Sequence, residues 1–261
     1  MIITRLSWAG LQISAEEFTL FIDPLENIAP LAGFLGQPRT ELLPIASPPG
    51  EAAALVTHIH SDHFDPLILR RLLGSKGYVY GPEAVASKAR EEGLAASPVK
   101  LEESFTIGPF NVTAVPAMDW RGDDQVSWVV RADDGAIFHG GDTIWHGYWW
   151  RVARRHGPFA LAFLPINGVI VQMPGLEPSG LPATLTPEQA AIAARLLQAR
   201  ALCPIHYDTF HNPPLYVEHP DAVNAAQTAA EKQGVRLEWA RPGESVSLTK
   251  ADSIDTPGLL A

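Results

Sequence analysis

Cysteine is almost absent from this sequence of 261 residues, which contains only Cys203. An intrachain disulfide is therefore excluded, and a single free thiol suits a reducing compartment. Cys203 lies inside the apolar run of residues 201–205, where we expect a small buried hydrophobic side chain rather than an activated thiol. A Gly-x-Ser-x-Gly elbow is also missing, so the sequence offers no evident protein nucleophile for covalent catalysis.

Long apolar runs are missing as well. No stretch approaches the roughly 18 apolar residues that a membrane-spanning helix needs. The opening residues, MIITRLSWAGLQIS, lack a basic segment followed by a long apolar one, so we expect no signal peptide. The sequence therefore predicts no membrane span and a cytoplasmic location.

Positive charge is scarce: 19 Lys and Arg residues face 29 Asp and Glu residues, for a formal net charge of −10. Nucleic acids and anionic lipids attract basic surfaces, so this balance argues against both as general partners. A nuclease function is disfavoured for the same reason, since no basic arm is present. We expect a small-molecule substrate, and a homo-oligomer is compatible with the sequence.

Hydrophobic residues make up 46% of the chain, enough for a substantial core. Short apolar runs bounded by turn residues predict strands. The predicted strands span residues 18–22, 53–57, 78–80, 111–115, 126–130, 136–138 and 160–164. Helical patterns alternate with these strands, and three of them start at Asp65-Pro66, at residues 81–82 and at Pro220. A capping box at residues 186–189 predicts a further helix over residues 190–200.

This alternation predicts an α/β fold in which two sheets pack together with helices outside, a four-layer α/β/β/α sandwich. We expect one domain over residues 1–261. Two Pro- and Gly-rich stretches, residues 28–50 and 168–182, are too long for simple connections. They indicate insertions near a functional face.

The densest group of polar residues lies in residues 57–66, Thr-His-Ile-His-Ser-Asp-His-Phe-Asp-Pro. Side chains at positions i and i+2 of an extended segment share a face, so His58 and His60 point the same way. Asp62 and His63 follow on a turn and can face the same point. Imidazole and carboxylate ligands suit Zn²⁺, Mn²⁺ or Fe²⁺. The alternative is a histidine-rich polar loop. We expect Asp65 itself to cap the following helix, because Pro66 comes directly after it.

The T-H-x-H-x-D-H pattern at residues 57–63 resembles the signature of the metallo-β-lactamase-fold hydrolases. Other segments resemble that superfamily in the same chain order: Trp8-Ala9-Gly10 with residues 20–24, Gly140-Gly141-Asp142-Thr143, and Ile205-His206-Tyr207. Residues 164–168, Met173 and residues 186–188 are similar to the branch that contains ascorbate-6-phosphate lactonase. Residues 115–117 ahead of Trp120 are similar to N-acyl-phosphatidylethanolamine phospholipase D-like members of that branch.

The resemblance implies a metallo-β-lactamase-type fold with two divalent metal ions, Zn or Mn with Fe as a further option. It assigns His58 and His60 to the first metal, Asp62, His63 and His206 to the second, and Asp142 to both as a bridge. Without the resemblance, Asp142 is an aspartate in a Gly-Gly-Asp turn at a strand end. His206, which ends an apolar run, would more often be a buried core histidine.

One position departs from the family pattern. A histidine for the first metal is expected after Pro116-Ala117, and Asp119 stands there instead. Asp119 can act as a carboxylate ligand, which would shift the preference toward harder metals such as Mn²⁺ or Fe²⁺. Alternatively it is too short to reach, or Asp123 or Asp124 replaces it. We expect Asp119 to ligate.

The resemblance implies a metal-dependent hydrolase that uses a dinuclear-metal-activated hydroxide on an ester, lactone or phosphodiester. Asp62 and Asp142 would be its catalytic carboxylates, with Asp62 a candidate to protonate the leaving group. The alternative is a degenerate member of the family that binds metal or ligand without efficient turnover, because Asp119 replaces the expected histidine.

Five further residues are candidates for substrate binding. Trp120 and Arg121 lie beside Asp119 and could contact an anionic group, although a surface arginine is the alternative. Trp145 and His146 belong to an aromatic cluster that would line a pocket or form the buried face of a helix. Tyr207 follows a predicted ligand and could donate to an oxyanion.

Overall fold

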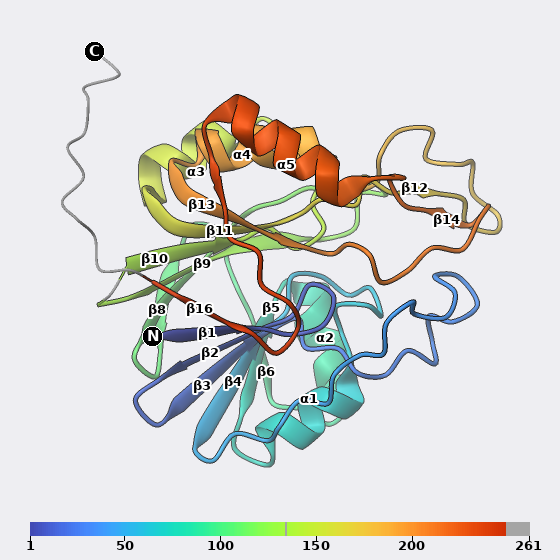
Figure 1. Ribbon diagram of the computed structural model, residues 1–261. Coiled ribbons are helices and arrows are strands. Elements are labelled where there is room, and N and C mark those ends of the chain that lie inside the picture. The colour runs from blue at the N-terminus through green and yellow to red at the C-terminus, as the bar shows by residue number, and fades with distance from the viewer. Residues whose placement is uncertain (134, 249–261) are drawn as a thin grey trace.

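Two seven-stranded sheets form the centre of the protein, as the computed structural model of residues 1–133 and 135–248 shows (Figure 1). The first sheet has the order β16-β1-β2-β3-β4-β5-β6 and the second β15-β13-β11-β10-β9-β8-β7. The first contains β1 (Ile2–Arg5), β2 (Leu11–Ala15), β3 (Phe18–Ile22), β4 (Glu51–Leu55), β5 (Tyr78–Gly81), β6 (Ala96–Pro98) and β16 (Ser245–Ser247). The second contains β7 (Ser104–Ile107), β8 (Phe110–Pro116), β9 (Val126–Ala132), β10 (Gly135–His139), β11 (Phe159–Pro165), β13 (Ala199–Ile205) and β15 (Arg236–Leu237).

Helices cover the outer face of each sheet (Figure 1). Helices α1 (Pro66–Leu73) and α2 (Glu83–Glu91) lie on the first sheet. Helices α3 (Trp149–His156), α4 (Pro187–Leu196) and α5 (Ala222–Gln233) lie on the second. This layer order confirms the predicted α/β/β/α sandwich. A short ribbon of β12 (Ile170–Val171) and β14 (Tyr216–Val217) pairs apart from both sheets. The single domain expected over residues 1–261 includes residues 134 and 249–261, which lie outside the described residues.

The inner strands are buried on both faces, which is why they read as continuous apolar runs in the sequence. Leu20 and Ile22 of β3 face the core between the sheets, whereas Phe21 faces α1 and α2. On β10, Ile137 faces the same central core and Phe138 packs toward α3, α4 and α5. Successive residues thus supply two cores, and their strand ends are fixed from both sides.

The structure confirms the capping box predicted before one helix and shows where the helices end. Thr186 and Gln189 form the predicted capping box at α4, with each side chain bonded to the other residue's backbone N–H. Gly234 ends α5 in the left-handed conformation with a φ of 65°. The helix predicted over residues 190–200 is wrong at its end: α4 stops at Leu196, Gln198 has a φ of 56°, and β13 begins at Ala199.

None of the helices within residues 1–133 and 135–248 combines the length and the apolar character needed to traverse a bilayer. The expectation drawn from the lack of long apolar runs is consistent with this finding.

Asp65 caps α1, as predicted from the proline that follows it, and also fastens a distant segment. Its Oδ1 accepts hydrogen bonds from the backbone N–H groups of Leu67 and Ile68 at 3.1 and 3.2 Å. Its Oδ2 accepts from Glu26 and Asn27 at 3.2 and 2.8 Å. The carboxylate therefore joins the histidine-rich loop and α1 to the residues just before the first long insertion.

We expect Asp65→Ala to lower the free energy of unfolding by about 2–4 kcal/mol, since it removes a helix cap and leaves two further backbone N–H groups unpaired. Urea unfolding followed by circular dichroism measures this loss. Glu91→Ala, on the exposed end of α2, is the control and should change it by less than about 0.5 kcal/mol. Equal loss in both variants would contradict the assigned role.

Candidate metal centre

The predicted ligands come from four segments that follow strand ends. His58, His60, Asp62 and His63 lie between β4 and α1, Asp119 follows β8, Asp142 follows β10, and His206 follows β13. The Gly-Gly-Asp turn is needed for close packing, because Gly141 has a φ of 66° and a Cβ there would lie 3.1 Å from Cβ of Thr57. His206 also has a positive φ, 57°, which is uncommon outside glycine and often found at functional sites.

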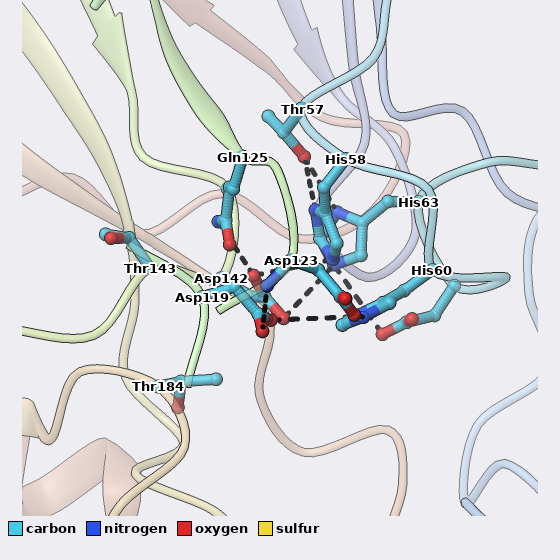
Figure 2. A network of polar contacts seen from close by, with 12 residues as sticks. Thr57, His58, His60, His63, Asp119, Asp123, Gln125, Asp142, Thr143 and Thr184 are labelled. Carbon is cyan, nitrogen blue, oxygen red and sulfur yellow. Dashed lines mark hydrogen bonds and ion pairs between the residues drawn. The ribbon is translucent and has the colours of Figure 1, made fainter. Parts of the chain in front are cut away.

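Among residues 1–133 and 135–248, three groups of side chains offer ligand atoms within 4.8 Å of one another. They are His58, His60 and Asp142; Asp62, His63 and His206; and His60, Asp119 and Asp123. Asp142 lies between the first two, because its Oδ1 is 3.6 Å from His58 Nε2 and its Oδ2 is 4.0 Å from His63 Nε2 (Figure 2). The structure thus brings all seven predicted ligands into one region.

The chemistry of these side chains fits divalent cations. His58 Nε2, His63 Nε2 and both ring nitrogens of His206 are buried and have no hydrogen-bond partner within the described chain. An unpaired buried polar atom costs roughly 1–3 kcal/mol, and a coordinated cation would satisfy it. Burial lowers the pKa of His58 to about 3, and it also lowers the pKa of His206, so both imidazoles are neutral as ligands must be.

The group formed by Asp62, His63 and His206 favours positive charge. Burial opposes protonation of His63, yet the carboxylates of Asp62 and Asp23 raise its pKa to about 10. Burial likewise disfavours ionised Asp62, but His63 and His206 hold the pKa of Asp62 well below its usual range. Carboxylates concentrated in a buried site need cationic neighbours, which a divalent ion supplies.

A set of residues that the sequence analysis did not assign to the site orients the ligands. Asp23 accepts from His63 Nδ1 at 2.8 Å, and Thr57 donates to it through both its backbone N–H and its hydroxyl. Trp8 Nε1 donates to Asp62 Oδ2 at 3.1 Å, and Gln125 Nε2 donates to Asp142 Oδ1 at 2.9 Å. Such outer partners fix ring and carboxylate orientation. Trp8 and Asp23 fall in the segments that resemble the family opening, which was the only available signal.

Asp119 reaches the site as a buried carboxylate. Its Oδ1 accepts from the backbone N–H groups of Arg121 and Asp123 at 2.7 and 3.2 Å. Its Oδ2 is unpaired among the described residues and lies 3.9 Å from His60 Nδ1. Burial, followed by the negative charge of Asp142, raises the pKa of Asp119. A cation between these carboxylates would relieve both effects.

Asp123 competes for the same imidazole. Its Oδ2 lies 2.9 Å from His60 Nε2 (Figure 2). Arg121 forms a close ion pair with the same carboxylate. Asp124, the other alternative to Asp119, is exposed. His60 therefore faces Asp119 with one ring nitrogen and Asp123 with the other.

A pocket of about 400 Å³ lies over these groups. Asp62, Asp142 and His206 contribute to its lining, and both long insertions form its walls. The apolar lining residues are Pro30, Leu31, Phe34, Leu35, Ile59, Trp120, Val169, Val171, Met173 and Ala183, with Arg121, Thr184 and Tyr216 among the polar ones. Of the five predicted substrate-binding residues, Trp120 and Arg121 lie at this pocket.

Trp145, His146 and Tyr207 lie elsewhere. Trp145 packs 5.8 Å from Trp149, and the buried His146 ring stacks on Trp149 at 4.1 Å. These contacts place the aromatic cluster on the core beneath α3 rather than in the pocket, because the helix begins at Trp149 and buries that face. Tyr207 packs under the Arg5 guanidinium, 4.9 Å away, and against Trp239.

Glu218, which follows β14, contacts the first insertion, part of which lines the pocket. Its carboxylate accepts from the backbone N–H of Asp208 at 2.6 Å and lies 3.5 Å from Arg39 of the first insertion. Arg39 also donates its backbone N–H to Thr209 at 2.8 Å. Burial raises the pKa of Glu218 from 4.5 to about 7, although these partners favour the ionised form.

Comparisons with known proteins identify the family and the fold. The model of the beta-lactamase superfamily domain matches residues 19–207. A UPF0173 metal-dependent hydrolase of Methanoculleus marisnigri is 27% identical to this chain, and the match covers 94% of this chain and 96% of the relative. Another UPF0173 metal-dependent hydrolase, from Thermus thermophilus, is 29% identical, and the match covers 88% of this chain and 91% of the relative. The solved structure of Igni18, a metallo hydrolase from Ignicoccus hospitalis, has a TM-score of 0.67 at 19% identity and covers 94% of this chain and 97% of its own. That last likeness concerns the fold.

We expect Asp23→Asn to weaken metal binding about 10- to 100-fold, because the loss of the carboxylate weakens the hold on His63 Nδ1. Competition with a coloured chelator gives the affinity. Asp133→Asn, on the exposed turn after β9, is the matched control and should bind metal as the wild type does. An unchanged affinity in Asp23→Asn would remove Asp23 from the centre.

Glu218 predicts a pH dependence of stability. Its folded pKa of about 7 exceeds the ordinary value of 4.5, so its contribution is complete below pH 4.5 and is lost as pH rises through 7. Glu218→Gln does not titrate and should gain roughly 1–3 kcal/mol relative to the wild type between pH 4.5 and 8. Urea unfolding of both proteins at each pH, with the same metal present, measures the difference. A constant difference across this range would contradict the shifted pKa.

Proposed function

The chain belongs to the beta-lactamase superfamily domain family and is a metal-dependent hydrolase of that superfamily, and from this premise we propose that it cleaves a small ester, lactone or phosphodiester at a dinuclear metal centre. The observation that carries the proposal is the position of Asp142. Its two carboxylate oxygens face His58 and His63, which belong to different ligand groups. A carboxylate in this position can serve both groups at once.

In the proposed centre, His58 and His60 would hold the first cation together with Asp119, which lies beside His60. Asp62, His63 and His206 would hold the second, and Asp142 would serve both. Bound divalent cations would supply Lewis acidity, which makes water acidic enough to ionise near neutral pH and polarises a carbonyl or phosphoryl oxygen. The carboxylates at the first site favour Mn²⁺ or Fe²⁺ there over an all-histidine Zn²⁺ site.

Asp62 is the proposed proton carrier. It is a ligand candidate and also lines the pocket, so it borders the space in which substrate must react. Its low pKa makes it an acceptor at neutral pH, and Trp8 holds one of its oxygens in place at 3.1 Å. A proton taken from the attacking water can then pass to the leaving group.

The pocket suits a small substrate with an apolar portion. Its volume of about 400 Å³ is near the lower end of the usual range for ligand pockets. Aliphatic and aromatic residues line about half of it, and the guanidinium of Arg121 at its edge is paired with Asp123. This favours esters and lactones over substrates of high negative charge.

We propose the cytoplasm as the location. The buried free thiol of Cys203 suits a reducing compartment.

A second candidate function, metal binding without efficient turnover, is favoured by one observation. Asp119 Oδ2 is 3.9 Å from His60 Nδ1, and Asp123 holds the other ring nitrogen at 2.9 Å. If His60 stays with Asp123, the first cation loses a ligand. Metal content and turnover together separate the two functions.

We expect the protein purified without chelator to contain two divalent ions per chain by elemental analysis, and to hydrolyse 4-nitrophenyl esters or simple lactones faster than bis(4-nitrophenyl) phosphate with Zn²⁺ or Mn²⁺. Asp142→Ala should lower kcat by at least about 1,000-fold, because it removes a ligand from both sites. Asp119→Ala should lower the metal content toward one ion per chain.

Asp124→Ala is the matched control for Asp119→Ala, since Asp124 is exposed in the same loop. It should keep both ions. Asp119→His tests the ligand assignment directly, and it should shift the preference from Mn²⁺ toward Zn²⁺. Two ions without turnover of any probe would favour the non-catalytic alternative, and no bound ion would overturn both functions.

A further inference from the structure

A buried polar network outside the ligand groups ends at the same pocket. Thr184 Oγ1 donates to Asn167 Oδ1 at 2.6 Å, and Asn167 Nδ2 donates to the phenol oxygen of Tyr216 at 2.9 Å. All three side chains are buried, and Thr184 and Tyr216 line the pocket. Asn167 belongs to residues 164–168, a stretch that resembles the lactonase branch and has no role in holding the cations.

The direction of these bonds leaves one proton unused. The Thr184 hydroxyl gives its proton to the amide oxygen of Asn167, so the amide nitrogen must face Tyr216. The phenol oxygen is therefore an acceptor in this bond. Its own proton remains available, and no acceptor for it is found within residues 1–133 and 135–248.

Tyr216 is held in place by its backbone and by packing of its ring. Its backbone pairs with Val171 in the β12–β14 ribbon and exchanges hydrogen bonds of 2.8 and 2.9 Å with Asn212. Phe34, from the first long insertion, packs edge-on against the ring at 5.8 Å. With Asn167 on its oxygen, the phenol is preorganised, which is the condition for a useful electrostatic contact.

Tyr216 also lies near the reacting region. Burial, and then the carboxylates of Asp62 and Asp142, raise the pKa of Tyr216 well above its usual value. Those carboxylates line the same pocket as the tyrosine. The phenol is therefore protonated at neutral pH and is a donor rather than a base.

We propose that Tyr216 donates a hydrogen bond to the substrate oxygen on which negative charge develops during hydrolysis, and that Asn167 is the positioning residue that points the phenol at it. The phenol keeps its proton throughout, so no proton transfer is involved. The inference rests on the proposed function, because it assigns a further residue to that reaction.

Tyr216→Phe tests the contact, since it keeps the ring and removes only the hydroxyl. With the metal-loaded protein and 4-nitrophenyl butyrate as the probe, kcat should fall about 10- to 100-fold while KM changes less than about 3-fold. Metal content and melting temperature should match the wild type. Tyr78→Phe, on β5 and half exposed, is the matched control and should keep the wild-type kcat.

Asn167→Asp tests the positioning role. The new carboxylate would still accept from Thr184 but would also accept the phenol proton, which diverts it from the substrate. The kcat should fall by a factor similar to that of Tyr216→Phe, and the double variant should be no slower than the slower single variant. Additive losses would mean that Asn167 acts independently of Tyr216.

Binding of butylphosphonate, an anion that resembles the charged state of a reacting ester, gives a second measurement by calorimetry. Tyr216→Phe should weaken this binding about 10-fold, and Tyr78→Phe should leave it unchanged. Wild-type kcat and binding in Tyr216→Phe would overturn the inference, as would a parallel loss of metal. If the wild-type protein does not hydrolyse the ester, the proposed function is wrong for esters. Phosphonate binding still decides, in that case, whether Tyr216 contacts a charged ligand oxygen.

Discussion

The concentration of negative charge in a buried site is the constraint on which the other features of this structure depend. Asp23, Asp62, Asp119 and Asp142 are all buried or nearly so at the ends of the two sheets. Carboxylates in such a setting are stable only beside positive charge or hydrogen-bond donors. Positive charge would come from the proposed cations. Hydrogen bonds come from the histidines and from the donors Trp8, Thr57 and Gln125.

The sandwich supplies the rigidity that this charge needs. Strands β4, β10 and β13 are each buried on both faces, so neither their positions nor their ends can shift without disturbing two cores. Six of the seven proposed ligands follow those ends, and Asp119 follows β8. The Gly140-Gly141 turn permits the close approach to Thr57 beside Asp142.

The sequence was informative where contacts are local or strongly patterned. The strands of the two cores, the Asp65 cap, the Thr186 capping box and the histidine loop all follow from residues within a few positions of one another. Contacts between distant positions were not accessible: Asp23 meets His63 across 40 residues, and Asn167 meets Tyr216 across 49. The Trp145 cluster was ambiguous because a buried helix face and an apolar pocket need the same side chains. The early end of α4 depended on the conformation of Gln198, which no residue type signals.

The two long insertions contribute part of the pocket walls, whereas the proposed ligands follow the strands of the sandwich. Reaction chemistry and substrate choice are therefore encoded in separable parts of the chain. Changes of length or composition in residues 28–50 or 168–182 can alter what enters the pocket without moving a ligand. Because of this separation, exchanging a loop could change the substrate of the scaffold. A grafted first insertion would have to preserve the contact of Arg39 with Glu218 and the packing of Phe34 against Tyr216.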